Sequence, residues 1–194
     1  MSLKYSVVCD TLGFIGYDVL EQPEMILETI KEAGYDDANL PCNPKLMAPR
    51  KLRPVVDSVG LEVPELLGAW AHFHAGEDRN LASGDEESRQ QSLSYARASI
   101  DLCAAMGAQF FEMCATQPAV PQIPFPKLPV ETLRDNFVSA LREICQCAAK
   151  QQITVLLEPL NLYEGFPGVL TTIYEAMQII ERTGMDGGAE RGWD

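Results

Sequence analysis

The chain has 194 residues, and its 15 Lys and Arg against 28 Asp and Glu give a formal net charge of −13. This charge argues against a nucleic-acid partner, because phosphate binding needs a basic surface, and against adhesion to anionic membranes. No apolar run reaches the roughly 18 residues of a membrane span, and the first residues lack the apolar core of a signal peptide. The six cysteines form no C-x-x-C pair, so we expect buried, reduced thiols in a cytoplasmic protein.

Short β-rich runs alternate with longer amphipathic segments along the chain. Five runs are predicted to be strands: Tyr5–Asp10, Asp37–Leu40, Leu66–Phe73, Gln109–Cys114 and Ile153–Leu157. Five helices are predicted between and after them: one from Pro23 to Gly34, a poorer one over 44–59 that Pro49 and Pro54 interrupt, Glu86–Met106, Val130–Lys150, and one that Thr171 or Thr172 caps and Gly184 ends. The polar stretch 76–85 and the proline-rich stretch 117–129 are predicted to be loops.

This alternation implies five successive βα units and a parallel sheet. The apolar run Val155–Leu157 indicates a strand that is covered on both faces. Two architectures fit: an open doubly wound sheet and part of a (β/α)8 TIM barrel. The turn Asp10–Gly16 after the first strand lacks the G-x-G-x-x-G pattern of nucleotide-binding doubly wound domains, which favours the barrel.

In both architectures functional groups lie at the C-terminal ends of the strands. Glu158 directly follows the β-rich run Ile153–Leu157, so we expect its carboxylate at the mouth of the sheet, where it must be paired, protonated or bound to a metal. The alternative for Glu158 is a structural ion pair with Lys or Arg. His72 and His74 would share one face of a strand and could bind metal or substrate, or could be structural. For Asp10 a turn role is favoured, and for Cys114 a packing role near any pocket.

The segment Leu157–Gly165, which reads LEPLNLYEG, resembles the strand-five signature of the sugar isomerase/epimerase family with a xylose-isomerase-like TIM barrel. That family includes hydroxypyruvate isomerases, ketose 3-epimerases, and inosose isomerases and dehydratases. Gly34–Leu40 and His74–Leu81 are similar to the family's strand-two entry and strand-three loop. Two positions depart from the usual pattern: Leu162 replaces an Arg, and Asn39 stands where a Glu is frequent.

The resemblance implies a partial barrel over residues 1–184, followed by an irregular tail over 185–194. It also implies a divalent metal (Mn²⁺, Mg²⁺ or Co²⁺) and a small ketose or sugar derivative as substrate. Glu158 matches the family's first metal ligand, which also takes part in proton transfer. Glu164 matches a residue that contacts substrate hydroxyls, and we expect His74 and Asn161 to bind substrate beside it. The implied reaction removes a proton beside a carbonyl and passes through an enediolate, from which isomerisation or epimerisation follows.

The family's other metal ligands are an Asp, a His and a second Glu from strands six to eight, and the sequence has no counterparts of them. We therefore expect a barrel truncated C-terminally to about five βα units and a chain that is weakly active or inactive, because one glutamate holds a catalytic metal poorly. A metal-dependent phosphoesterase of the AP-endonuclease type is an alternative that two histidines and the negative charge disfavour. A non-enzymatic fragment that forms homo-oligomers through exposed sheet edges is another.

Overall fold

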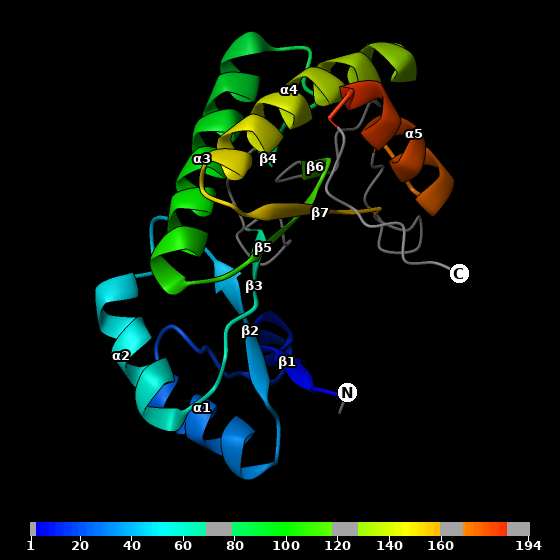
Figure 1. The fold of residues 1–194 in the computed structure, drawn as a ribbon. Coiled ribbons are helices and arrows are strands. Elements are labelled where there is room, and N and C mark those ends of the chain that lie inside the picture. The colour runs from blue at the N-terminus through cyan, green and yellow to red at the C-terminus, as the bar shows by residue number, and fades with distance from the viewer. Residues whose placement is uncertain (1–2, 69–78, 118–127, 160–168, 186–194) are drawn as a thin grey trace.

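The computed structural model describes residues 3–68, 79–117, 128–159 and 169–185. Its main sheet has five strands: β1 (Ser6–Val8), β2 (Asp37–Cys42), β3 (Glu65–Gly68), β5 (Phe110–Cys114) and β7 (Thr154–Glu158). A 3-10 helix η1 (Cys9–Ile15) follows β1, and the α-helices are α1 (Pro23–Glu32), α2 (Pro49–Val59), α3 (Glu86–Met106), α4 (Val130–Lys150) and α5 (Ile173–Thr183). Figure 1 shows α1 to α4 along one side of the sheet.

The order of the strands decides between the two predicted architectures. The five strands are neighbours in chain order, and every neighbouring pair is parallel. A doubly wound sheet reverses its strand order at a switch point, whereas a barrel adds each strand beside the previous one. The described sheet has no reversal, so the prediction of a (β/α)8 TIM-barrel type with five βα units is confirmed.

The outer face of the sheet, which lies against the helices, is apolar. Register and alternation place nine residues on it: Val7, Ala38, Leu40, Cys42, Leu66, Phe111, Met113, Val155 and Leu157. All nine are buried or half-buried in one core. The helices contribute residues at helical spacing, such as Leu93, Ala96 and Ile100 of α3, because a surface helix buries one stripe.

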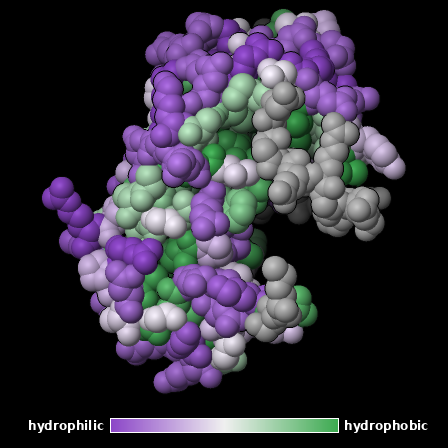
Figure 2. Space-filling view, in the orientation of Figure 1, coloured by the Kyte–Doolittle hydropathy of each residue, from purple (hydrophilic) through white to green (hydrophobic). Residues whose placement is uncertain are grey.

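The inner face of the sheet is only partly covered by described residues. In β7 the residues Thr154, Leu156 and Glu158 are exposed, and Leu156 is 37% exposed. The prediction that Val155–Leu157 is covered on both faces is therefore wrong, because the described helices pack on the outer face only. Figure 2 shows the surface hollowed between the part that holds β1 and the part that holds β7.

The long helices follow their sequence signals closely. The bounds of α3 and α4 agree with the prediction. The Asp85 carboxylate caps α3 by accepting a hydrogen bond from the backbone N–H of Ser88. Helix α5 begins with a capping box, in which the side chains of Thr172 and Glu175 reciprocally bond the backbone N–H groups.

The predicted interruption of the second helix by Pro49 is wrong. Pro49 is the first residue of α2, where a helix needs no hydrogen bond from the N–H that proline lacks. Pro54 lies inside the helix, which continues to Val59. Burial of Leu52 and Val56 against the core holds this helix despite the lost backbone bond.

Part of the predicted loop over 76–85 is instead a short strand. Strand β4 (Arg79–Asn80) pairs antiparallel with β6 (Thr116–Gln117). The pairing is stabilised locally by the Arg79 guanidinium, which is buried and stacks 4.1 Å from the centroid of the Tyr95 ring. Two-residue strands carry no periodicity, so the sequence pattern could not predict this small sheet.

The first strand is shorter than predicted, and the third agrees with the prediction as far as the structure describes it. Strand β1 ends at Val8 because the chain turns into η1 at Cys9. Strand β3 ends at Gly68, and the rest of the predicted third strand lies outside the described residues, as does the predicted tail from residue 186 onward. None of the described helices is long and apolar enough to cross a membrane.

Candidate active site

Three glutamates from neighbouring strands lie on the inner face of the sheet. The residues that share this face are Ser6, Val8, Asp37, Asn39, Pro41, Glu65, Leu67, Phe110, Glu112, Cys114, Thr154, Leu156 and Glu158. Glu112 of β5 pairs in register with Leu156 of β7, and Glu158 is the next residue of β7 on the inner face. Glu158 ends β7 at the C-terminal edge, whereas Glu65 begins β3 in register with Phe110. The three carboxyl groups act on one another electrostatically.

Glu158 is the last residue of β7 and is exposed at the mouth of the sheet, where the sequence predicted it. The thiol of Cys114, its partner in register on β5, points at its carboxylate with 3.7 Å between Sγ and Oε2. None of the ion pairs between described residues includes Glu158. Within the described part of the chain, the alternative of a structural ion pair between Glu158 and a Lys or Arg is therefore not supported.

Glu112 is the most strongly perturbed carboxyl group of this face. Burial raises its pKa from about 4.5 to about 8, and a hydrogen bond with Glu158 adds to the rise. The negative charges of Glu65 and Asp10 act in the same direction. Glu112 therefore keeps its proton at neutral pH and can donate a hydrogen bond, as a carboxylic acid does in an apolar, acidic setting.

A polar network links the first three strands on the same face. The hydroxyl of Ser6 donates to Oδ1 of Asn39 at 2.9 Å, and Nδ2 of Asn39 donates to Oε2 of Glu65 at 2.6 Å. Burial and the charge of Glu158 raise the pKa of Glu65, and the bond from Asn39 opposes that rise. Asn39 thus positions the half-buried carboxylate of Glu65, for which the sequence analysis predicted no role.

The oxygen atoms of this face have the right chemistry for a hard divalent cation, which prefers carboxylate and carbonyl ligands. However, the described residues contain no group of three or more His, Cys, Asp or Glu side chains that could hold a metal ion. Glu158 and the protonated Glu112 do not make a metal site by themselves.

The structure tests the predicted positions only where it describes the chain. Glu158 lies at the predicted strand end. His72, His74, Asn161 and Glu164 lie outside the described residues. Asp10, for which a turn role was favoured, lies in the first turn of η1 and acts electrostatically on Glu112.

The sequence analysis assigned no role to Glu65 or Glu112. A signal for Glu112 was present, since an ionisable residue stands between Phe111 and Met113 within an apolar strand. A carboxyl group in that position must lie opposite the packed face, where it is desolvated or bound. The pairing of Glu112 with Glu158 itself needs the register of two distant strands.

Comparisons with solved structures find the same fold in sugar-acting enzymes. A 3-keto-D-glucoside 4-epimerase from E. coli superposes with a TM-score of 0.70 at 22% identity, over 87% of this chain and 60% of that one. A D-psicose 3-epimerase from Clostridium cellulolyticum H10, solved with D-tagatose, gives 0.67 at 14% identity, over 83% and 54%. A xylose isomerase-like TIM barrel protein from Mycobacterium smegmatis, in complex with magnesium, gives 0.62 at 20% identity, over 87% and 55%.

The chain thus spans 54% to 60% of the length of these three proteins. No protein with a curated description matches it significantly by sequence. The family model of the xylose isomerase-like TIM barrel matches residues 15–187, which is most of the chain. The resemblance seen in the strand-five motif is therefore confirmed, and the chain belongs to the xylose isomerase-like TIM barrel family.

Proposed function

We propose that this chain acts on a small ketose or sugar derivative and moves a proton beside its carbonyl group, which isomerises or epimerises the sugar. The observation that carries this proposal is the pairing of Glu112 with Glu158 at the C-terminal mouth of the sheet. Family membership supports it, and so do the epimerase titles of the E. coli and C. cellulolyticum structures.

The two glutamates suit opposite halves of a proton transfer. The Glu158 carboxylate is exposed at the mouth and accepts the proton from the carbon beside the carbonyl. Glu112 carries a proton at neutral pH and donates a hydrogen bond to the carbonyl oxygen, where negative charge develops. The raised pKa of Glu112 suits the acid, and the exposed position of Glu158 at the mouth suits the base.

The product depends on where the proton returns. Return to the neighbouring carbon of the enediol gives an isomer, and return to the same carbon from the opposite face gives an epimer. Epimerisation needs a second proton-transfer group across the substrate. The substrate-binding roles of Glu164, His74 and Asn161 remain part of this proposal, on the motif alone.

A divalent cation is part of the proposal because the family resemblance implies one and the M. smegmatis relative is a magnesium complex. Glu158 would supply one oxygen ligand. Because the described residues do not form a complete metal site, we assign no reaction step to the cation and propose that this chain is weakly active. A cytoplasmic location and self-association stay predictions.

Deuterium exchange tests the proposal, because it requires fewer catalytic groups than net isomerisation does. Exchange at the carbon beside the carbonyl needs one base only, so it reports proton removal even where net isomerisation is slow. A panel of ketoses is incubated with the chain in D2O with and without Mn²⁺, and exchange is followed by proton NMR. We expect exchange that Glu158→Gln lowers by about 100-fold or more, since an amide cannot accept the proton.

Glu62→Gln is the matched control, because Glu62 precedes β3 at the opposite end of the sheet and pairs with Lys4. This control should exchange at the wild-type rate. Exchange that is absent in the wild type, or equal in wild type and Glu158→Gln, contradicts the proposal.

A further inference from the structure

A pocket lies beside the carboxylates, at the C-terminal end of β1. Its volume is about 410 Å³, which falls in the range of small-molecule sites. The segment from Cys9 to Leu20 forms most of its wall, and Pro41 and Leu46 close it from the next βα unit. Pro41 belongs to the inner face of β2, so one wall of the pocket is part of the face that carries Glu112 and Glu158.

The lining of this pocket, which we call the β1 pocket, exposes large apolar side chains. Phe14 is 67% exposed, Leu46 is 66% exposed and Tyr17 is 46% exposed. Single exposed apolar residues are ordinary, but several that gather around a cavity mark a binding surface. Aromatic faces of this kind stack on the C–H face of a sugar ring or on another aromatic ring.

The charge of the β1 pocket is negative. Asp10 and Asp18 are its charged residues, and none of the described residues that line it is Lys or Arg. Asp18 is fixed in place, since its Oδ1 accepts a hydrogen bond from the backbone N–H of Leu20 at 2.8 Å. The negative charge of Asp10 also contributes to the raised pKa of Glu112. The negative charge of the pocket repels a phosphate dianion and leaves an uncharged hydroxylated ring unaffected.

We infer that the β1 pocket binds an uncharged ring substituent of the sugar substrate and that it selects against phosphorylated sugars. This inference rests on the proposed function for the identity of the substrate as a sugar. The substituent would stack on Phe14 and Tyr17, and its hydroxyls would donate to Asp10 or Asp18. A second sugar ring and an aromatic aglycone share this chemistry.

Direct binding tests the inference without turnover. Saturation-transfer difference NMR and calorimetry are carried out with phenyl β-D-glucopyranoside, cellobiose and D-glucose 6-phosphate. We expect the two ring-bearing glucosides to bind more tightly than the phosphate, and their relative affinity identifies the substituent. Phe14→Ala should weaken the better of them by about tenfold, the loss of one stacked aromatic contact. Leu46→Ala should weaken it by a smaller factor, and both exposed positions tolerate truncation.

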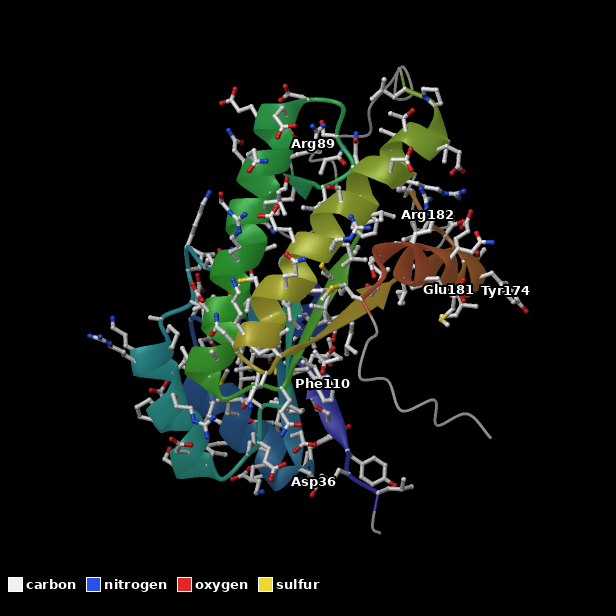
Figure 3. All side chains as sticks on the ribbon, turned by 45° about the horizontal axis from the view of Figure 1, so that its top comes forward. Asp36, Arg89, Phe110, Tyr174, Glu181 and Arg182 are labelled. Atoms are coloured by element: carbon white, nitrogen blue, oxygen red, sulfur yellow. The ribbon has the colours of Figure 1, made fainter. Side chains whose placement is uncertain are left out.

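Tyr174→Ala is the matched control, because Tyr174 is an 80% exposed aromatic that projects from α5 (Figure 3) and does not line the β1 pocket. It should bind all probes like the wild type. Removing both pocket charges by Asp10→Asn with Asp18→Asn should raise the affinity for D-glucose 6-phosphate several-fold, since the repulsion is lost.

Equal affinity of the wild type for the phosphate and the glucosides overturns the inference, as does unchanged glucoside binding in both Phe14→Ala and Leu46→Ala. Binding that depends on Phe14 without deuterium exchange would count against the proposed function alone. Exchange without a dependence on Phe14 would count against the β1 pocket alone.

Discussion

The outer and inner faces of the sheet carry opposite chemistry although they alternate along the same strands. On β5 the outward Phe111 and Met113 are buried in the core, while the inward Glu112 and its neighbour Phe110 are only half-buried. TIM-barrel interiors are commonly filled by branched apolar residues in layers. Here the inner face holds Glu65, Glu112 and Glu158 instead. The outer face therefore supplies stability, and the inner face keeps ionisable groups together at a cost in stability.

The largest expected effect is a difference in the free energy of unfolding between alanine variants of two neighbouring phenylalanines. Phe111→Ala should lower the free energy of unfolding by about 3 to 5 kcal/mol, because a fully buried ring leaves a cavity. Phe110→Ala, one residue away on the other face, should lower it by only about 1 kcal/mol, since its ring is partly solvated in the folded state. Urea unfolding followed by circular dichroism measures both.

Phe110 lies on the inner face beside Glu65 and Thr154 in register, so the pair of variants compares the faces directly. Equal losses in the two variants would mean that the inner face is as tightly packed as the outer one. That result would remove the distinction between the faces.

The next effect is the pH dependence that Glu112 imposes. Its pKa is raised in the folded chain, so the unfolded chain loses this proton first as the pH rises. The fold then loses stability between about pH 4.5 and about pH 8, and the loss is complete above the folded pKa. Glu112→Gln removes this titration and keeps a hydrogen-bond donor. Between about pH 5 and about pH 8.5, the unfolding free energy of the variant should therefore fall by roughly 2 to 4 kcal/mol less than that of the wild type.

Met113→Leu is the control for this measurement. Met113 lies next to Glu112 on the outer face and does not titrate, so its substitution should shift stability by the same amount at both pH values. A pH slope that is unchanged in Glu112→Gln would show that Glu112 is not held protonated by burial.

The smallest expected effect concerns the helices that cover the outer face. Thr172→Ala breaks the capping box of α5 and should lower the unfolding free energy by about 1 kcal/mol, because an N–H of the first turn loses its acceptor. Ser94→Ala is the control, since the Ser94 hydroxyl bonds the carbonyl of Gln90 within α3 and alanine suits a helix interior. The loss should be constant at neutral pH and above, unlike that of the inner face, and should shrink at acidic pH, because the Thr172 hydroxyl helps to lower the pKa of Glu175. A loss that varies with pH at neutral pH and above would connect the cap to the inner carboxyl groups.

Much of the architecture was predictable because it depends on local patterns. Helical spacing predicted α3 and α4, the pair Thr171 and Thr172 indicated the start of α5, and Gly184 indicated its end. The strand end at Glu158 was also predictable, since a charged residue after an apolar run stops burial. By contrast, the small sheet formed by β4 and β6 has too few residues to show a period.

The candidate site was predictable only in part. Glu112 pairs with a residue of a strand that follows it by a whole helix, and the paired positions are set by the register of β5 and β7. The β1 pocket gathers Phe14 and Tyr17 after the first strand with Leu46 after the second. Such contacts depend on how two βα units stack, which no local spacing records.

The amino-acid order alone decided the βα alternation, the family motif around Glu158 and the acidic charge, because each is a property of neighbouring residues or of composition. Tertiary structure decided which side of each strand is packed, and thereby which carboxyl groups meet. Alternation along a strand places residues on two faces but does not say which face the helices cover. Only the packing of α1 to α4 on one side made Glu112 a protonated partner of Glu158.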